Sequence, residues 1–306
     1  MREQIIGIGG ANVDLCGRAS GRVVPGDSNI GSIRISAGGV CRNICENVVK
    51  LGTPAALISV AGDDANGDFL LRRCEAAGLD VSAVHRISGK RTGAYLSIHS
   101  GDGEMTAAVN DMEIVSCITP AFLTPYIQRI RAAKAILIDA NLPPDTIRWI
   151  GETFSDRPIF ADPVSCAKAE NLLPVLKRLF LLKPNQTEAE TLTGCHDPQT
   201  SAAALHKMGV RHVCVSSGAD GVADYGEHGS LLTRPKTLRS FPNATGAGDS
   251  LTGGLLAGYA QGMPLEEALR FAVTASVLTL QSADTIRPDL SRELVMKSQR
   301  ECFCYA

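Results

Sequence analysis

The sequence predicts an α/β fold with a doubly wound, mostly parallel sheet, and with a small β-sheet that stands off it as a lid. After residue 115, apolar runs of strand length alternate with amphipathic segments of helix length, which is typical of β–α–β units. The chain has 306 residues, of which 44% are hydrophobic, and this is enough to bury a large core. No repeat or linker interrupts it, so we expect a single domain over residues 1–306.

The first part of the chain is expected to supply the start of the main sheet and the whole lid. Val40, Ile44 and Val48 recur at helical spacing behind Gly38 and Gly39, which predicts a helix over residues 40–51. The segments near 12–36 and 91–111 would form the lid. The other expected elements are strands at 4–10, 13–16 and 55–61, an irregular or edge segment at 20–36, a helix at 68–77, and a hairpin built from 92–99 and 105–109.

The second part of the chain is expected to complete the parallel sheet. Short apolar runs predict its strands, and the segments between them predict helices. Two helices, at 247–261 and 264–280, are expected to finish the chain. The other predicted strands lie at 135–139, 158–162, 179–183 and 212–216, and the other helices lie at 120–132, at 145–154 and from residue 186 onward.

Composition argues against several classes of protein. The formal net charge is −2, aromatic residues make up 5%, and there is no basic tract, all of which disfavours a nucleic-acid partner. No segment approaches the ~20 apolar residues that cross a bilayer, and the N-terminus reads as a strand rather than a signal peptide. The ten cysteines form no C-x-x-C pair. They are therefore interpreted as free, mostly buried thiols of a cytoplasmic protein, with Cys302 and Cys304 in an ordinary C-terminus.

The motif with the strongest chemical meaning is Asn243-Ala-Thr-Gly-Ala-Gly-Asp249, which runs directly into an apolar helix. A helix N-terminus attracts phosphate through its unpaired N–H groups, and the turn of Gly246, Ala247 and Gly248 allows a close approach of the backbone. Asp249, in the first turn, can accept a proton from an attacking substrate hydroxyl. Asp in a first helical turn is also favourable by itself. The small-residue turn before it favours the catalytic interpretation.

This motif resembles the C-terminal motif of the ribokinase-like (PfkB) carbohydrate kinases. The resemblance extends over nearly the whole chain, and it implies the ribokinase-like fold and transfer of the γ-phosphate of ATP to a hydroxyl of a sugar or nucleoside. It also implies ATP and Mg²⁺ at the site, Asp249 as catalytic base, and a homodimer joined through the lids. Four more segments match family motifs in the same order: Ala11-Asn-Val-Asp14, Ala37-Gly-Gly-Val-Cys-Arg-Asn43, Leu182-Lys-Pro-Asn-Gln-Thr-Glu188 and Ser216-Ser-Gly-Ala-Asp-Gly221.

One position departs from the family pattern. Members that K⁺ activates commonly carry Asp six residues before the base, where this chain has Asn243. An amide oxygen holds a cation less strongly than a carboxylate does. Whether the protein uses K⁺ is therefore left open by the sequence.

Five polar or glycine residues are candidates to bind the substrate. Asp14, with Asn12 beside it, ends an apolar strand, where α/β sheets place ligands, and its carboxylate can accept hydrogen bonds from hydroxyls. Gly38 and Gly39 allow a close approach to the backbone, although a plain tight turn explains them equally well. Asn43 can both donate to and accept from a hydroxyl.

Three further residues, outside this set of five, are each interpreted separately. Asn141 follows an expected strand directly and is a substrate candidate by position. Arg42 is interpreted as a solvated charge on the surface of its helix. Lys168 could assist near the nucleotide or the substrate, but a surface lysine is more common.

The nucleotide is expected to lie near two further segments. Asn185 and Glu188 are three residues apart where a helix starts, and Glu188 would order water around the Mg²⁺ of ATP, although a helix-capping pattern explains the pair as well. Ser216, Ser217, Gly218 and Gly221 form a turn after a strand and can line the nucleotide. The alternative for this turn is a simple hairpin.

Within the family, further segments resemble the pseudouridine kinases, among them Gly26-Asp-Ser-Asn-Ile-Gly-Ser, Ala108-Val-Asn-Asp-Met112 and Asp162-Pro-Val-Ser165. The implied reaction is 5′-phosphorylation of pseudouridine. Asn110 and Asp111 would then be lid residues that reach the substrate, and a polar turn is the plainer interpretation of that pair. Ribose, adenosine and fructose stay open as alternative acceptors.

Two other classes of function are weighed against a kinase. Gly7-Ile-Gly-Gly-Ala-Asn12 begins like the G-x-G-x-x-G fingerprint of a dinucleotide-dependent oxidoreductase, but it lacks the third glycine and leads into a second predicted strand rather than a helix. A non-catalytic sugar sensor could use the same fold. The intact Asp249 argues against that sensor.

Overall fold

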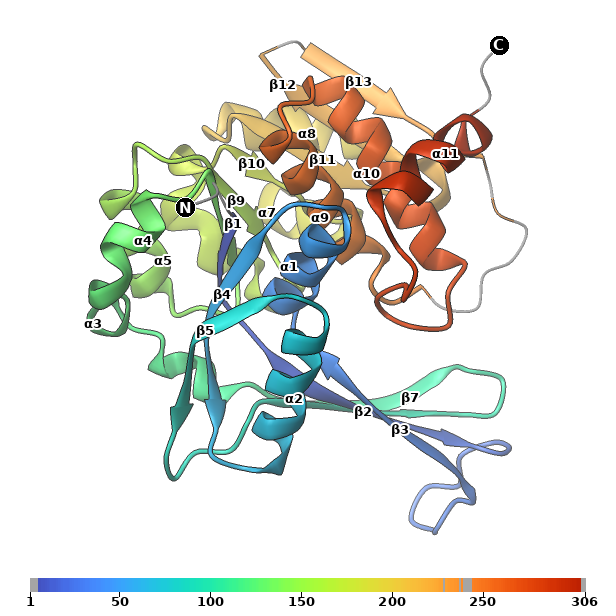
Figure 1. The fold of residues 1–306 in the computed structure, drawn as a ribbon. Coiled ribbons are helices and arrows are strands. Elements are labelled where there is room, and N and C mark those ends of the chain that lie inside the picture. Colours follow the sequence, from blue (N-terminus) through green and yellow to red (C-terminus); the bar gives the residue numbers. More distant parts are fainter. Residues whose placement is uncertain (1–4, 228, 237, 239–243, 304–306) are drawn as a thin grey trace.

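Two separate β-sheets organise the chain, whose computed structural model describes residues 5–227, 229–236, 238 and 244–303 (Figure 1). The main sheet has the strand order β13-β12-β11-β10-β9-β8-β1-β4-β5, and it is parallel except for β12 and β13 at one edge. Its strands are β1 (Ile5–Ile8), β4 (Ala55–Gly62), β5 (Asp80–Ile87), β8 (Ala135–Asp139), β9 (Ile159–Asp162), β10 (Leu181–Leu182), β11 (His212–Ser216), β12 (Val222–Gly226) and β13 (Gly229–Thr233).

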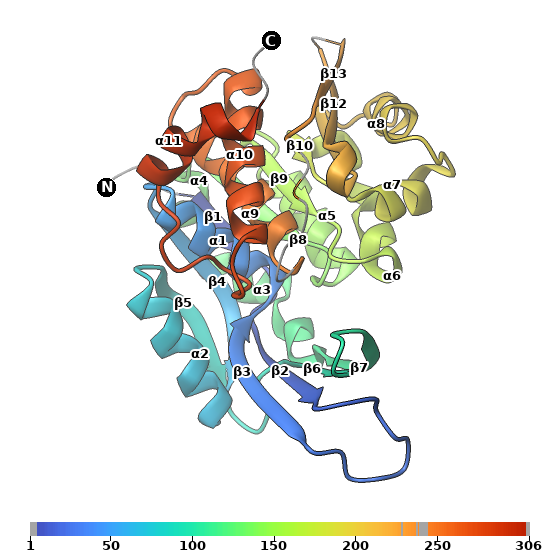
Figure 2. The same ribbon diagram turned by 90° about the vertical axis from the view of Figure 1, so that its right-hand side faces the viewer.

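Helices cover both faces of the main sheet, as a doubly wound fold requires (Figures 1 and 2). One face packs against α1 (Val40–Lys50), α2 (Ala65–Ala76), α9 (Ala247–Ala260) and α10 (Leu265–Leu280), with α11 (Arg292–Cys302) outside α10. The other face packs against α3 (Pro120–Leu123), α4 (Ile127–Arg131), α5 (Pro144–Thr153), α6 (Cys166–Ala169), α7 (Gln186–Thr193) and α8 (Pro198–Lys207). The 3-10 segments are Glu113–Cys117, Thr124–Tyr126, Glu170–Arg178 and Gly218–Asp220.

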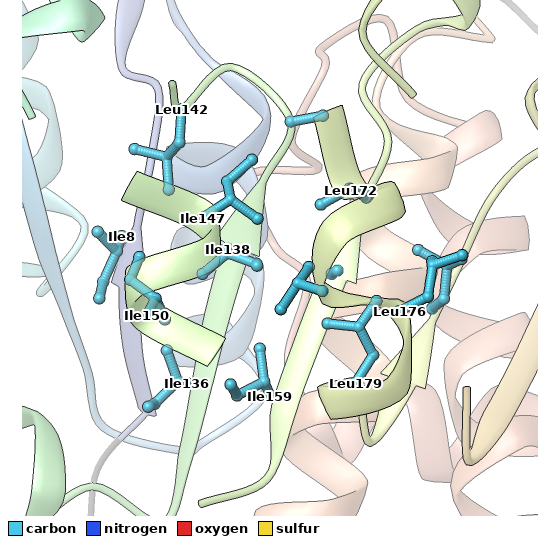
Figure 3. Close-up of a cluster of buried hydrophobic side chains, with 14 of the residues drawn as sticks. Ile8, Ile136, Ile138, Leu142, Ile147, Ile150, Ile159, Leu172, Leu176 and Leu179 are labelled. Carbon is cyan, nitrogen blue, oxygen red and sulfur yellow. The ribbon is translucent and has the colours of Figure 1, made fainter. Parts of the chain in front are cut away.

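The core lies on both sides of the main sheet because successive strand residues point to opposite faces. In β1, Ile6 and Ile8 join the cluster beneath α5, whereas Ile5 joins the cluster beneath α1 and α9. Figure 3 shows the first cluster, in which strand side chains such as Ile138 lie opposite Ile147 of the facing helix. These central strands are mostly apolar, and β8 and β9 are apolar up to the aspartate that ends each of them, which is the pattern of parallel strands buried on two faces.

The small sheet is the predicted lid, and it stands off the body of the molecule (Figures 1 and 2). Its strand order is β3-β2-β6-β7, and its strands are β2 (Asn12–Ala19), β3 (Gly31–Gly38), β6 (Ala94–His99) and β7 (Met105–Asp111). Residues aligned across neighbouring strands share a face, so the register divides the sheet into two faces. Asp14, Tyr95 and Asn110 are aligned and share one face, and Leu15, Leu96 and Val109 are aligned on the other.

The predicted fold class is confirmed, and most predicted elements are present with ends moved by a few residues. The strand predicted at 212–216 coincides with β11, and the helix predicted at 40–51 is α1. Of the two alternatives for residues 20–36, an irregular segment or an edge strand, the structure has an edge strand in the second half, since β3 pairs with β2 along its whole length.

Other element predictions are wrong. The helix expected at 120–132 is broken into α3, a 3-10 turn and α4, because Pro125 has no N–H group to continue the helical hydrogen bonds. The chain does not finish with the helix at 264–280, since α11 follows with Ser291 as its N-cap. Strand β5, helix α8 and the edge strands β12 and β13 were not predicted.

The structure also bears on membrane spanning and on the cysteines. None of the helices within the described ranges has the length and hydrophobicity needed to cross a membrane. The cysteines in those ranges are free thiols. Cys41, Cys45, Cys74, Cys214 and Cys302 are buried, Cys166 is exposed, and the rest are half-buried. Cys304 lies outside the described residues.

Candidate active site

Buried charged side chains gather where three neighbouring strands of the main sheet end. Asp139 is the last residue of β8, Asp162 is the last residue of β9, and Lys183 follows β10 directly. All three are buried. Open α/β sheets bind ligands beyond the carboxyl ends of their strands, and buried charges are concentrated at functional sites. The sequence patterns indicated no role for these three side chains, and the signal that could have indicated one is a charged residue at, or directly after, the end of an apolar strand.

Helix α9 begins at a turn that leaves its first amide groups without a side-chain cap. Its N-cap, Gly246, has φ 85° and ψ −9°. A Cβ added at Gly246 would overlap the main-chain oxygen of Thr285, so the position requires glycine. After Ala247, a Cβ added at Gly248 would lie 3.2 Å from Nζ of Lys183. A helix N-terminus and a buried ammonium group thus lie side by side, an arrangement that attracts phosphate.

Asp249 lies in the first turn of α9 and is held by α1. Nδ2 of Asn43 donates a hydrogen bond of 2.7 Å to Oδ2 of Asp249. Burial and the charge of Asp162 raise the pKa of Asp249 to about 7, against the opposing effects of Asn43, Lys183 and Arg42. A carboxylate with this pKa both accepts and releases a proton near neutral pH, as a general base must.

Asn43 has a second polar atom that is free. Its Oδ1 is buried and has no hydrogen-bond partner in the structure. An unpaired buried acceptor is costly unless a ligand satisfies it. The side chain therefore holds Asp249 with one atom and offers the other to a hydroxyl donor.

The turn before α1 brings the lid strands against the main sheet. A Cβ added at Gly38 would overlap the carboxylate of Asp14, and one added at Gly39, whose φ is 96°, would lie 2.6 Å from the main-chain oxygen of Gly10. Nδ2 of Asn12 donates a 2.7 Å hydrogen bond to Oδ1 of Asp14. Burial raises the pKa of Asp14. The structure thus brings together the predicted substrate residues of β2 and the di-glycine turn.

The interpretation of Arg42 as a solvated helix charge is wrong, because its side chain is only 2% exposed. Nε donates to the main-chain oxygen of Gly38 at 2.9 Å, Nη2 donates to that of Ala37 at 2.8 Å, and Nη1 pairs with Glu46 at 2.5 Å. Carbonyl groups at the end of β3 need donors, and Arg42 supplies them from inside the protein. It therefore fixes the position of the di-glycine turn.

Asp139 holds Asn141 and the ends of two other segments in place. Its Oδ2 accepts hydrogen bonds from the backbone N–H groups of Gly10 and Cys41, each at 3.1 Å, and from Nδ2 of Asn141 at 2.9 Å. Nζ of Lys168 donates to Oδ1 of Asn141 at 2.5 Å. Burial lowers the pKa of Lys168. Asn141 is thus fixed beside the β1–β2 connection, where the sequence placed a substrate contact.

Asn185 and Glu188 form a capping box at the start of α7. The side chain of Asn185 accepts from the backbone N–H of Glu188 at 2.9 Å, and Oε2 of Glu188 accepts from the backbone N–H of Asn185 at 2.8 Å. The capping interpretation is therefore correct as geometry. Glu188 is nevertheless buried, and burial and the charge of Asp162 raise its pKa. A capping glutamate on the protein surface would have neither this burial nor this neighbouring charge.

The turn from Ser216 to Gly221 connects β11 to the antiparallel strand β12, so the hairpin interpretation is also correct as geometry. A β-bridge joins Ser216 to Asn185, which places this turn beside the start of α7. The turn includes Gly218, and Oγ of Ser217 is buried without a hydrogen-bond partner. Like Oδ1 of Asn43, this atom is available to a ligand.

Asn110 and Asp111 are separated by the pleat of β7. Asn110 is aligned with Tyr95, which is aligned with Asp14, so Asn110 shares the face of the lid that carries the substrate candidates. Asp111 points to the opposite face and pairs with Arg91 at 3.4 Å. Only one member of the predicted pair can therefore reach a substrate under the lid.

Two other interpretations differ in what the structure can say about them. The glycine-rich opening at residues 7–12 leads into strand β2 and not into a helix, so the dinucleotide-binding fingerprint is absent from it. Asn243, on which the interpretation of K⁺ use depends, lies outside the described residues.

Known proteins resemble this chain over nearly its whole length. The profile of the pfkB family carbohydrate kinases matches residues 2–292. A pseudouridine kinase of Escherichia coli (strain K12) is 37% identical over 298 residues, which is 95% of each chain. A carbohydrate kinase from Agrobacterium tumefaciens is 31% identical with a TM-score of 0.86 and 97% of each chain covered. The ribokinase of Arabidopsis thaliana complexed with ribose and ATP has a TM-score of 0.87 at 23% identity, covers 98% of this chain and 99% of its own, and shows the shared fold.

Proposed function

Because the chain belongs to the pfkB family of carbohydrate kinases and is an ATP-dependent sugar or nucleoside kinase, we propose that it phosphorylates the 5′-hydroxyl of pseudouridine with Asp249 as the catalytic base. The observation that carries the base assignment is the position of Asp249. It lies in the first turn of α9, accepts a hydrogen bond from Asn43 and has a pKa of about 7. It is thus a proton acceptor placed directly beside the uncapped helix N-terminus.

The chemistry follows from this placement. Asp249 takes the proton of the substrate hydroxyl while the oxygen of that hydroxyl attacks the γ-phosphorus of ATP. The bond from that phosphorus to the β,γ-bridging oxygen breaks, and ADP leaves. Negative charge builds on the transferred phosphoryl group, and the N–H groups after Gly246 are positioned to stabilise it. Gly248 keeps the approach open because it carries no Cβ.

The nucleotide side of the site would be formed by α7 and by the turn after β11. Ser217 offers an unpaired buried hydroxyl there, and Glu188 offers a buried carboxylate. Within the described ranges, no group of three or more His, Cys, Asp or Glu side chains is arranged to hold a metal ion. Glu188 would therefore act through water on Mg²⁺ that arrives with ATP, and Mg²⁺ when bound neutralises phosphate charge.

Three features support a ribonucleoside, and pseudouridine in particular, as the acceptor. The curated relative that is 37% identical is named a pseudouridine kinase. Asp14 and Oδ1 of Asn43 offer acceptors to ribose hydroxyls. Pseudouridine carries a ring N–H that uridine lacks, and Asn110, on the substrate face of the lid, has an amide oxygen that could accept from it.

We expect pseudouridine to be turned over with a far higher kcat/KM than uridine, ribose, adenosine or fructose. We also expect Asn110→Ala to reduce the ratio of kcat/KM between pseudouridine and uridine by a larger factor than it lowers kcat/KM for both. The reason is that a polar group paired with the substrate discriminates against an analogue that leaves it unpaired. Asp111→Ala is the matched control, since this neighbour points to the other face of the lid. Release of ADP with each acceptor measures both effects. A higher kcat/KM for ribose or adenosine would reject the pseudouridine assignment but not the kinase.

We also propose that two copies of the chain associate through their lids. The face of the small sheet opposite Asp14 carries a row of large apolar side chains, in which Ile33 is 77% and Val109 is 63% exposed. Ile35, Leu96 and Ile98 extend the row across the sheet. An exposed apolar sheet face with two open edges is normally covered, and a second copy of the same face is a self-complementary cover.

Light scattering of the purified protein should therefore give the mass of a dimer. Ile33→Glu should convert it to a monomer, because the new carboxylate would be buried without a partner in the apolar interface. Ser32→Glu is the matched control, because the adjacent residue is also exposed but points to the opposite face. A monomeric wild-type protein, or equal effects of the two variants, would show that the apolar face is not the interface.

A further inference from the structure

We propose that the buried ion pair of Lys183 and Asp162 is a positioning device that keeps Asp249 ready to accept a proton. This inference rests on the proposed function, in which Asp249 is the catalytic base. Lys183 and Asp162 are positioning residues in this role, because they influence the proton transfer through Asp249.

The pair lies at the floor of the site and is almost fully enclosed. Asp162 ends β9 and Lys183 follows β10, and these two strands are neighbours in the main sheet. Nζ of Lys183 is 3.1 Å from Oδ2 of Asp162, and the two side chains are 6% and 5% exposed. A buried ion pair adds little net stability compared with well-packed apolar residues. Stability is therefore a weak reason for a pair at this place.

Two contacts connect the pair to the first turn of α9. Oγ1 of Thr252 lies 3.3 Å from Oδ2 of Asp162 and 3.2 Å from the main-chain oxygen of Gly248, so its single hydroxyl proton can be donated to either acceptor. On the other side of the pair, Nζ of Lys183 is so near to Gly248 that a Cβ added at Gly248 would lie 3.2 Å from it. The residue next to Gly248 in the chain is Asp249. The pair is thus held against the backbone that carries the base.

The two members of the pair act on Asp249 in opposite directions. The negative charge of Asp162 raises the pKa of Asp249, as burial does, and the positive charge of Lys183 lowers it. From α1, the hydrogen bond of Asn43 and the charge of Arg42 also lower the pKa of Asp249. Burial lowers the pKa of Lys183, but the charges around it, first that of Asp162, raise it overall, so its ammonium group stays charged.

The consequence is that the pKa of Asp249 is set by the two opposite charges together with burial, and not by burial alone. Without Lys183, burial and Asp162 would hold the proton on Asp249 at neutral pH. Without Asp162, the carboxylate would be a weaker base, because a lower pKa reduces its affinity for the substrate proton. A buried pair of opposite charges placed together keeps the pKa between these limits.

The test is the pH dependence of kcat/KM for the phosphate acceptor. Asp249 works when it is deprotonated, so activity should fall as the pH drops through its pKa, which is about 7. Asp162→Asn should move this fall to lower pH, and Lys183→Met should move it to higher pH, each by about half a pH unit or more. Lys183→Arg keeps the positive charge, so the low-pH limb of its kcat/KM profile, where activity falls, should lie at the wild-type pH.

A second variant and a second readout guard against a failure to fold. Lys183→Met leaves Asp162 buried without a partner, so the double variant Asp162→Asn with Lys183→Met is measured beside it, and its limb should lie between those of the single variants. The ¹³C carboxyl resonance that Asp249→Asn removes reports the pKa of the base directly in the protein without nucleotide. The pKa read from this resonance should fall in Asp162→Asn and rise in Lys183→Met.

The outcomes separate this inference from the proposed function. If Asp249→Asn abolishes turnover but Asp162→Asn and the double variant leave the limb and the carboxyl titration unchanged, the pair has only a structural role and the inference is overturned. A shift of both single variants in the same direction would overturn it too. Full turnover in Asp249→Asn would instead reject the base assignment itself. Opposite shifts, with recovery in Lys183→Arg, support the inference.

Discussion

Asp249→Asn is expected to lower kcat by roughly 10²–10⁴-fold, which is the usual contribution of a positioned general base. The substitution keeps the size of the side chain, and the new amide oxygen can still accept the hydrogen bond from Asn43. What it removes is the ability to take the proton of the attacking hydroxyl. The structure of the site should therefore survive while the chemical step fails.

Steady-state rates at saturating ATP and acceptor measure this effect, and circular dichroism with thermal unfolding checks the fold. Asp145→Asn is the matched control, because Asp145 also lies in the first turn of a helix, at the exposed start of α5. It should keep normal turnover. Turnover of Asp249→Asn within a few-fold of the wild-type value would show that another group takes the proton.

Gly246→Ala is expected to lower kcat by about 10²-fold, because a displacement of about 1 Å at a catalytic group is enough for such a loss. The residue has φ 85°, which disfavours any side chain, and its new Cβ would overlap the main-chain oxygen of Thr285. Backbone cannot move aside as a flexible side chain does. The turn must shift, and it carries the amide groups of α9 and Asp249 with it.

Gly194→Ala separates the steric effect from the strain of the backbone. Gly194 has φ 70°, but a Cβ there meets no atom within 4 Å, and the residue ends α7 on the surface. This variant should lose stability without losing kcat. Gly248→Ala should have a smaller effect than Gly246→Ala, because its new Cβ would lie 3.2 Å from one side-chain atom, Nζ of Lys183, instead of overlapping a backbone atom. Equal kcat values for Gly246→Ala and the wild-type protein would show that the turn does not position the base.

Local sequence patterns were sufficient to predict the fold class and the start of α9. The central strands are apolar along their length, and α1 shows its helical spacing directly, so their burial follows from their own residues. The turn before Asp249 is also recognisable, since two glycines beside a helix start are typical of an anion-binding turn. Weak or mixed patterns failed. The broken helix at 120–131 depends on Pro125, and α11 is a mostly polar helix whose place depends on packing against α10.

Contacts between distant segments were decided only by the tertiary structure. Arg42 looks like a surface charge in the sequence, and it is buried because the carbonyl groups of the di-glycine turn need its donors. Lys183 and Asp162 lie in two separate segments that each resemble family sequences, but no sequence pattern pairs the two residues, and the parallel pairing of β9 and β10 makes them an ion pair. Strand register, likewise, places Asn110 on the face of the lid that carries Asp14 and Asp111 on the other. A sequence determines which residues a segment contains, but the electrostatic state of Asp249 depends on charges that only folding brings within a few ångströms of each other.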